Sequence, residues 1–224
     1  MSADMSAPAT AAATHWDSAY SRKGAEKVGW FEPTPTRSIE IIVGLLGSAA
    51  GKLESASVID VGGGASSLVD RLLELGVRHV AVLDLSDVGL ELSRQRLGPE
   101  GSSARVSWIV GDVTAYRPQC ERGYTVWHDR AVFHFLMDEQ QQRAYRDSVL
   151  ASVALEGFVI VATFALDGGP TECSRLPIRR HDVESITRIF DAERFTLLSH
   201  MPHEHVTPAG ETQKFTYFVL ARKS

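Results

Sequence analysis

Three consecutive glycines, Gly62, Gly63 and Gly64, form the part of the sequence best suited to holding a charged ligand. They follow a short apolar run at residues 57–60 and precede a helical pattern at residues 66–75. Glycine permits a sharp turn and a close approach of the backbone to a ligand. The free N–H groups and positive dipole end of the following helix favour an anion. The pattern therefore predicts a nucleotide-type binding loop.

Two common nucleotide loops fit this segment poorly. An ATP-binding P-loop has Lys and then Ser or Thr after its last glycine, whereas Ala65 and Ser66 follow here, which excludes that loop. A dinucleotide loop has the spacing G-x-G-x-x-G, and Ser67 occupies the position of its third glycine. The sequence thus weakens an assignment to NAD binding.

Carboxylates stand at the ends of three successive predicted strands, at Asp60, Asp84 and Asp112. Asp84 is placed to accept both hydroxyls of a ribose, and Asp112 to accept a bond from an adenine amino group. Asp60 is placed to order the glycine loop or to meet a ligand ammonium. NAD has no ammonium group, whereas the methionine half of S-adenosylmethionine has one. The three carboxylates therefore favour S-adenosylmethionine as cofactor.

The segment at residues 127–136 holds four candidates for chemistry on a methyl acceptor. Methyl transfer mainly requires alignment and exclusion of water, and a base only if the nucleophile arrives protonated. Arg130 is a candidate positive neighbour for a thiolate. Asp129, His128 and His134 are candidates to remove a proton from an amine, and both histidines also suit a structural role. Their spacing matches no metal-ligand template, so no metal is predicted.

Alternating strands and helices must position these residues. Strands are predicted at residues 57–60, 79–83, 106–110, 124–127, 157–163, 195–200 and 215–220, and helices from Thr36 through Leu46 and at 66–75, 87–97, 138–154 and 181–191. Strand–helix alternation predicts a largely parallel sheet covered on both faces, a doubly wound α/β fold. The last two strands have no helix between them, which predicts an antiparallel hairpin at a sheet edge.

The motifs D-x-G-G-G-x-S, L-D-L-S and G-D-V resemble those of the class I methyltransferases across residues 55–165. This resemblance implies a Rossmann-like seven-stranded sheet of order 3-2-1-4-5-7-6 with strand 7 antiparallel. It also implies that Leu85, Ser86 and Val113 contact S-adenosylmethionine beside the three carboxylates and the glycines, with His128 added from the fourth strand.

Two further segments carry local resemblances. Asp129, Arg130 and Ala131 resemble both the W-D-R-G segment of thiopurine and related thiol methyltransferases and the D-K-G-T segment of some protein-lysine methyltransferases. The aromatic stretch from His15 to Phe31 resembles the entry segments of the same groups, where it covers the cofactor. The resemblance implies that Trp30 or Phe31 closes over the cofactor.

Four functions are compatible with these residues. The first is methyl transfer to sulfur, nitrogen or oxygen of a small molecule, and the second is N-methylation of a protein lysine. An NAD-type oxidoreductase is disfavoured by Ser67 and Asp60. A non-catalytic cofactor-binding module is disfavoured by the complete set of carboxylates and the aromatic entry segment.

The composition of the chain limits the partners and the cellular location that we expect for it. A formal net charge of −5 argues against nucleic-acid and anionic-membrane partners. Two cysteines are too few for a disulfide scaffold, and we expect a cytoplasmic protein, monomeric or homodimeric. Residues 1–14 have no signal-peptide pattern and are predicted to be a disordered tail. Residues 15–224 are predicted to form one domain, of which 15–50 are the helical entry segment.

Overall fold

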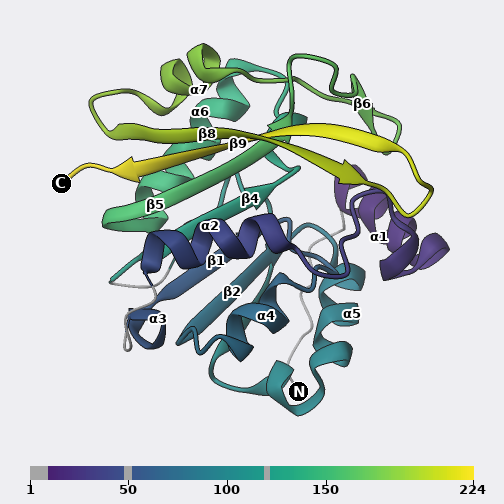
Figure 1. Ribbon diagram of the computed structural model, residues 1–224. Coiled ribbons are helices and arrows are strands. Elements are labelled where there is room, and N and C mark those ends of the chain that lie inside the picture. Colours follow the sequence, from purple (N-terminus) through teal and green to yellow (C-terminus); the bar gives the residue numbers. More distant parts are fainter. Residues whose placement is uncertain (1–9, 48–51, 119–121) are drawn as a thin grey trace.

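The computed structural model describes residues 10–47, 52–118 and 122–224 and contains one large mixed sheet (Figure 1). The seven strands lie in the order β3-β2-β1-β4-β5-β9-β8. Their bounds are β1 (Ser57–Val61), β2 (His79–Asp84), β3 (Val106–Val110), β4 (Tyr124–Arg130), β5 (Val153–Phe164), β8 (Phe195–Val206) and β9 (Thr212–Arg222). Strands β1 to β5 are parallel, and β9 is antiparallel to both neighbours. The predicted strand order and terminal hairpin are confirmed.

Helices cover both faces of the sheet (Figure 1). They are α1 (Ala11–Lys23), α2 (Thr36–Leu46), α3 (Lys52–Ser55), α4 (Leu68–Glu74), α5 (Asp87–Leu97), α6 (Glu139–Ser152) and α7 (Val183–Phe190). Apolar side chains of α2, α4 and α5 pack on one face, and those of α6 and α7 pack on the other. Parallel strands need this double cover because both of their faces are apolar.

The end of β4 differs from the sequence prediction. The prediction ended this strand at Trp127, because three polar residues follow. In the structure β4 continues through His128 and Asp129 to Arg130, since β1 pairs with it on one side and β5 on the other. Pairing on both sides therefore overrides polarity, and alternate polar side chains point to opposite faces.

The entry segment also differs from its prediction. Helix α1 begins at Ala11, capped by the side chain of Thr10, so residues 11–14 are helical although a disordered tail was predicted. Alanine has the highest helix propensity, and this Ala-rich start packs onto α5 through later turns. Residues 1–9 of the predicted tail lie outside the described part. Helix α2 has the predicted bounds, and Pro35 is its N-cap residue.

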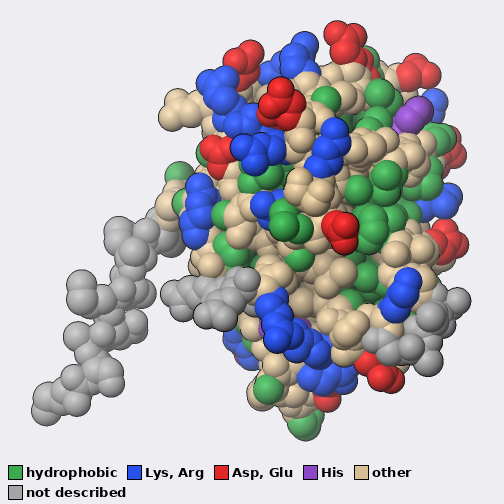
Figure 2. Space-filling view, turned by 90° about the vertical axis from the view of Figure 1, so that its left-hand side faces the viewer, with side chains coloured by type: hydrophobic (Ala, Val, Ile, Leu, Met, Phe, Trp, Pro, Cys, Tyr) green, Lys and Arg blue, Asp and Glu red, His purple; other side chains and the backbone are tan. Residues whose placement is uncertain are grey.

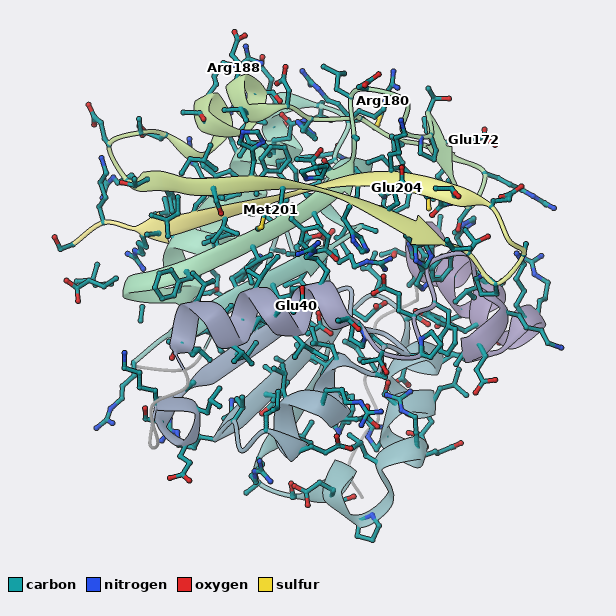
Figure 3. All side chains as sticks on the ribbon, in the orientation of Figure 1. Glu40, Glu172, Arg180, Arg188, Met201 and Glu204 are labelled. Atoms are coloured by element: carbon teal, nitrogen blue, oxygen red, sulfur yellow. The ribbon has the colours of Figure 1, made fainter. Side chains whose placement is uncertain are left out.

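Further short elements complete the chain. The turns η1 (Ala25–Lys27), η2 (Gly98–Ser102) and η3 (Phe133–Phe135) are 3₁₀ helices, and β6 (Glu172–Cys173) pairs with β7 (Leu176–Pro177). In Figure 3, Glu172 and Arg180 mark this hairpin and the end of the segment that joins β5 to α7. In Figure 1, β6 lies at the same end of the sheet as α1. No helix among the described residues is long and apolar enough to cross a membrane.

The first prediction concerns Arg96 of α5, which fixes the chain between β1 and α4. Its guanidinium donates to the carbonyls of Ala65 and Ser66 at 2.9 and 2.7 Å and pairs with Asp70. Arg96→Ala should lower the free energy of unfolding by about 1–2 kcal/mol, because two carbonyls lose charged donors. Urea unfolding measures this loss. The control Arg143→Ala removes only an exposed pair with Glu139 and should cost less than about 0.5 kcal/mol. An equal loss in both variants would contradict the role of Arg96.

Candidate cofactor and acceptor site

The carboxyl ends of β1 to β4 open onto a cavity of about 410 Å³, a volume suited to a small ligand. Several predicted cofactor residues line it: Trp30, Gly62, Asp84, Leu85, Asp112 and Val113. A second hollow of about 40 Å³ adjoins the glycine loop and is lined by Asp60, Gly62, Gly63, His128 and Trp30, among others. Trp30, Gly62 and Arg130 line both spaces, so the two are neighbours.

The glycine loop has no room for side chains. A Cβ atom at Gly62 would lie 2.0 Å from a methyl group of Val132, and one at Gly63 would lie 2.5 Å from Val82. One at Gly64 would lie 2.3 Å from the hydroxyl of Tyr20. Gly62 and Gly64 also have φ values of +66° and +39°. Gly62 and Gly64 therefore need glycine for their backbone conformation, and all three positions need it because no Cβ atom would fit. Without side chains in between, the backbone of the loop lies close to the cavity.

Asp84 lies at the end of β2 with its carboxylate held by the loop that follows. Its Oδ1 accepts the N–H of Ser86 at 2.7 Å, and its Oδ2 lies close to Gly64. Burial and the nearby charges of Asp60 and Asp17 raise the pKa of Asp84 to about 7, although the bond from Ser86 opposes the shift. Hydroxyl donors of a ligand should bind strongly to a carboxylate with this pKa, because they stabilise its charged form.

The other predicted adenosine residues divide into lining and supporting groups. Asp112 is an exposed residue at the cavity, and its Oδ1 accepts the N–H and hydroxyl of Thr114. Ser86 is fully buried and lines neither space. Its hydroxyl donates to Asp17 of α1 and accepts the N–H of Gly89, so Ser86 connects α1 to the start of α5.

Asp60 and His128 form a buried pair beside the smaller hollow. Asp60 Oδ1 and His128 Nδ1 are 2.7 Å apart, and each residue is 3% exposed. The two positions are register neighbours on β1 and β4, which places both side chains on the same face of the sheet. Asp60 Oδ2 has no hydrogen-bond partner among the described residues. A buried carboxylate oxygen without a donor fits a cationic group of a ligand.

Aromatic side chains of the entry segment cover the two spaces. Trp30 contacts Trp16 and Tyr20 edge-on at 5.6 and 5.8 Å between ring centroids, and its Nε1 donates to the Tyr20 hydroxyl at 3.3 Å. Tyr20 is 4% exposed and packs between the glycine loop and Gly89 of α5. Trp30 and Tyr20 line both spaces, whereas Phe31 lines the smaller one. This arrangement closes the glycine loop against water.

Arg130 lies where the two spaces meet. Its guanidinium donates to the carbonyl of Trp30 and pairs with Glu32 at 3.1 Å. His203 and His205 of β8 face the same Glu32 oxygen at 3.7 and 3.4 Å. Burial opposes the charge of Glu32, but the bond from His205 and the charge of Arg130 prevail, so the pKa of Glu32 is lowered. The entry segment is thereby joined to β4 and β8.

The two other predicted catalytic residues line neither space. Asp129 is fully buried and accepts bonds from the N–H groups of Val132 and Phe133 and the hydroxyl of Tyr145. Burial raises its pKa to about 6 despite these donors. His134 is also fully buried, and burial lowers its pKa to about 3. Asp129 therefore supports the turn after β4, whereas both ring nitrogens of His134 are without a hydrogen-bond partner among the described residues. The catalytic roles of the two residues remain predictions.

Sequence reasoning missed several residues that line these spaces. Tyr20, Glu32 and Ser38 do so. For Tyr20 the available signal was an aromatic residue within an otherwise polar stretch of the entry segment. Ser38 stands inside an apolar helical pattern, and its polarity there was the available signal.

Comparison with known proteins agrees with this geometry. Residues 58–151 match the family model described as a methyltransferase domain. No curated protein matches the chain in sequence. The solved N-methyltransferase NodS from Bradyrhizobium japonicum, in complex with S-adenosyl-L-homocysteine, is 14% identical with a TM-score of 0.67, covering 93% of this chain and 98% of its own.

Two further solved structures have the same fold. A SAM-dependent methyltransferase from Anabaena variabilis is 16% identical with a TM-score of 0.68, covering 100% of this chain and 99% of its own. The 1,6-didemethyltoxoflavin-N1-methyltransferase of Burkholderia thailandensis, with bound 1,6-didemethyltoxoflavin and S-adenosylhomocysteine, is 18% identical with a TM-score of 0.61. The match covers 100% of this chain and 94% of that one.

Residues 58–151 match a methyltransferase domain, and the sheet order and the glycine loop agree with the class I S-adenosylmethionine-dependent methyltransferase fold. The residues of this chain fit the cofactor. The unpartnered oxygen of Asp60 suits the ammonium, and the glycine loop has no side chains to obstruct a ligand. Asp84 and Asp112 lie together at the cavity that would receive adenosine. The cofactor assignment made from the sequence is confirmed.

The second prediction concerns Asp84. Its pKa of about 7 means that the free protein is largely protonated there at pH 6 and charged at pH 8. Because hydroxyl donors favour the carboxylate, S-adenosylhomocysteine should bind about tenfold more weakly at pH 6 than at pH 8. Isothermal titration calorimetry measures the two affinities. Asp84→Asn should bind with little dependence on pH, and an unchanged dependence in that variant would assign it to another group.

The third prediction concerns Asp129. Asp129→Ala leaves the buried N–H of Phe133, the half-buried N–H of Val132 and the Tyr145 hydroxyl without an acceptor, which should cost about 3 kcal/mol of unfolding free energy. Tyr145→Phe, which removes one of these donors, should cost less. Urea unfolding and turnover are measured together. A loss of turnover with unchanged stability would instead support the predicted catalytic role of Asp129.

Proposed function

We propose that this methyltransferase acts on a heteroatom of a small, largely apolar acceptor. The observation that carries the proposal is the wall of the larger cavity beyond Asp84 and Asp112. This wall contains Trp16, Phe135, Leu136, Met137, Leu176 and Pro177. Trp16 and Phe135 meet edge-on at 5.1 Å, which is a favourable aromatic geometry. Such a surface favours a flat or apolar molecule over a charged one.

The cavity offers its acceptor little help with proton removal. S-adenosylmethionine, when bound, supplies a methyl group on a positively charged sulfur. Among the described residues, the titratable groups that line the larger cavity beyond Asp84 and Asp112 are Tyr20, Arg130 and Cys173. Burial raises the pKa of Tyr20, and it raises that of Cys173 to about 11, so neither is a base at neutral pH. The chain therefore aligns the reactants and excludes water, which suits a nucleophile with a free electron pair.

Methylation of a protein lysine is less well supported. Placing an ammonium in an apolar space is costly unless a carboxylate pairs with it. The described carboxylates that line the larger cavity are Asp84 and Asp112, at the end assigned to adenosine. Glu32 lines the smaller hollow and is paired with Arg130. The apolar wall is therefore poorly matched to a lysine side chain.

The surface agrees with a small-molecule partner. On the face shown in Figure 2, Lys and Arg side chains are interspersed with Asp and Glu, around a patch of hydrophobic side chains. A nucleic-acid partner would favour a continuous basic tract instead. The formal net charge of −5 points the same way.

A labelled methyl donor tests the proposed acceptor class. The protein is incubated with it and with either a panel of apolar thiols and amines or a whole-cell protein extract. Transfer to members of the small-molecule panel is the expected result. Label found in protein alone would favour the lysine alternative. Thermal stabilisation by NAD and not by S-adenosylhomocysteine would contradict the cofactor assignment itself.

The fourth prediction concerns Leu176 in the apolar wall. Leu176→Asp should lower kcat/KM for an apolar acceptor at least about tenfold, because it places a charge where apolar surface is buried. The affinity for S-adenosylhomocysteine should change less than about twofold. Leu198→Asp, on an exposed part of β8, is the matched control and should leave both values unchanged. A parallel loss of cofactor affinity would place Leu176 beside the cofactor.

A further inference from the structure

A chain of four buried polar side chains runs from the glycine loop to the antiparallel strand β9. Asp60 Oδ1 and His128 Nδ1 are 2.7 Å apart, His128 Nε2 and Ser38 Oγ are 2.8 Å apart, and Ser38 Oγ and Tyr217 Oη are 3.4 Å apart. Each of the four residues is at most 3% exposed. They come from β1, β4, α2 and β9, so four elements distant in sequence meet in one hydrogen-bonded chain.

Every bond in this chain is satisfied by one direction of donation when the ring proton of His128 is on Nδ1. In that direction the Tyr217 hydroxyl donates to Ser38, the Ser38 hydroxyl donates to His128 Nε2, and His128 Nδ1–H donates to Asp60. In this direction the Ser38 hydroxyl acts once as donor and once as acceptor, and the Tyr217 hydroxyl donates to Ser38 and has the Arg130 side chain as a second partner. The hydrogen-bonded chain therefore ends on the carboxylate of Asp60, whose Oδ1 is held in place by His128.

The second oxygen of that carboxylate is the one without a partner. Asp60 Oδ2 is buried and has no donor among the described residues. It lies beneath Gly63, where a Cβ atom would come within 2.7 Å of it. Asp60, His128 and Ser38 all line the smaller hollow next to this loop. Because leaving a charged acceptor unpaired is costly, this oxygen is suited to a charged donor from a ligand.

We propose that Ser38, with Tyr217 behind it, is a positioning residue for the cofactor. Through His128 it fixes the rotamer of Asp60, so that Oδ2 receives the ammonium of the methionine half of the cofactor. The proposal rests on S-adenosylmethionine use and is independent of the acceptor. Ser38 and Tyr217 act through Asp60 and set cofactor affinity, whereas the methyl-transfer step does not depend on them.

A nucleophilic role for Ser38 is the main competing interpretation, because Asp60, His128 and Ser38 are the residue types of a serine–histidine–aspartate triad. On one side the Ser38 hydroxyl lies 2.8 Å from His128 Nε2. Its hydroxyl is also within hydrogen-bond distance of Tyr217. The geometry thus favours orientation of the carboxylate over attack by the hydroxyl.

The test compares ligands that differ only in the ammonium. Calorimetry measures the affinity of the full chain for S-adenosylhomocysteine and for its desamino analogue. In Ser38→Ala, S-adenosylhomocysteine should bind about tenfold more weakly, while the desamino analogue should bind as it does to the unaltered protein. At saturating S-adenosylmethionine, kcat should stay within about twofold. Tyr217→Phe should give a smaller loss in the same direction and provides a second variant if Ser38→Ala folds poorly.

Ser152→Ala is the matched control, because Ser152 is equally buried but lies on α6 and donates within its own helix. It should leave both affinities unchanged. An equal loss for both ligands in Ser38→Ala, or no loss for either, would overturn the proposal, as would labelling of Ser38 by a fluorophosphonate. Failure of the unaltered protein to bind S-adenosylhomocysteine would instead refute the cofactor assignment.

Discussion

A carboxylate buried at the centre of a parallel sheet is the constraint around which this molecule is arranged. Asp60 sits at the end of β1, 3% exposed, and water cannot solvate it there. Its Oδ1 is bonded to His128, whereas its Oδ2 is buried and has no partner among the described residues. The strand order, the long β4 and the position of α2 all serve to bring partners to this one group. Ligand recognition follows from Asp60 Oδ2, the carboxylate oxygen that has no hydrogen-bond partner among the described residues.

The architecture could be predicted from the chain because local pattern and tertiary packing agree over most of it. Alternating apolar strands and amphipathic helices indicated the doubly wound sheet, and the missing helix before β9 indicated the terminal hairpin. The end of β4 was wrong, since local polarity could not reveal that β1 and β5 would pair beside His128 and Asp129. The predicted disorder of residues 11–14 was wrong, because a short Ala-rich run has no local pattern that shows it to be the first turn of α1, which Thr10 caps.

The cofactor side of the site was more predictable than the acceptor side. Asp60, Asp84 and Asp112 stand at strand ends, and parallel strands bring such ends to one edge by topology alone. Side-chain direction is a different matter. Asp129 alternates with His128 along β4 and so points to the opposite face, toward Tyr145, where it bonds backbone N–H groups. Ser38 joins the site only through long-range packing, which residue spacing does not encode.

The attachment of Glu32 has a consequence for how the protein matures during synthesis. This residue of the entry segment is held by Arg130 from the middle of the chain and faces His203 and His205 of β8. A nascent chain therefore exposes its N-terminal aromatic cover well before the ribosome has made the histidines that fasten it. Until β8 is translated and docked, the aromatic entry segment that covers the glycine loop lacks the contacts of Glu32 with His203 and His205. Completion of the site is thus tied to completion of the chain.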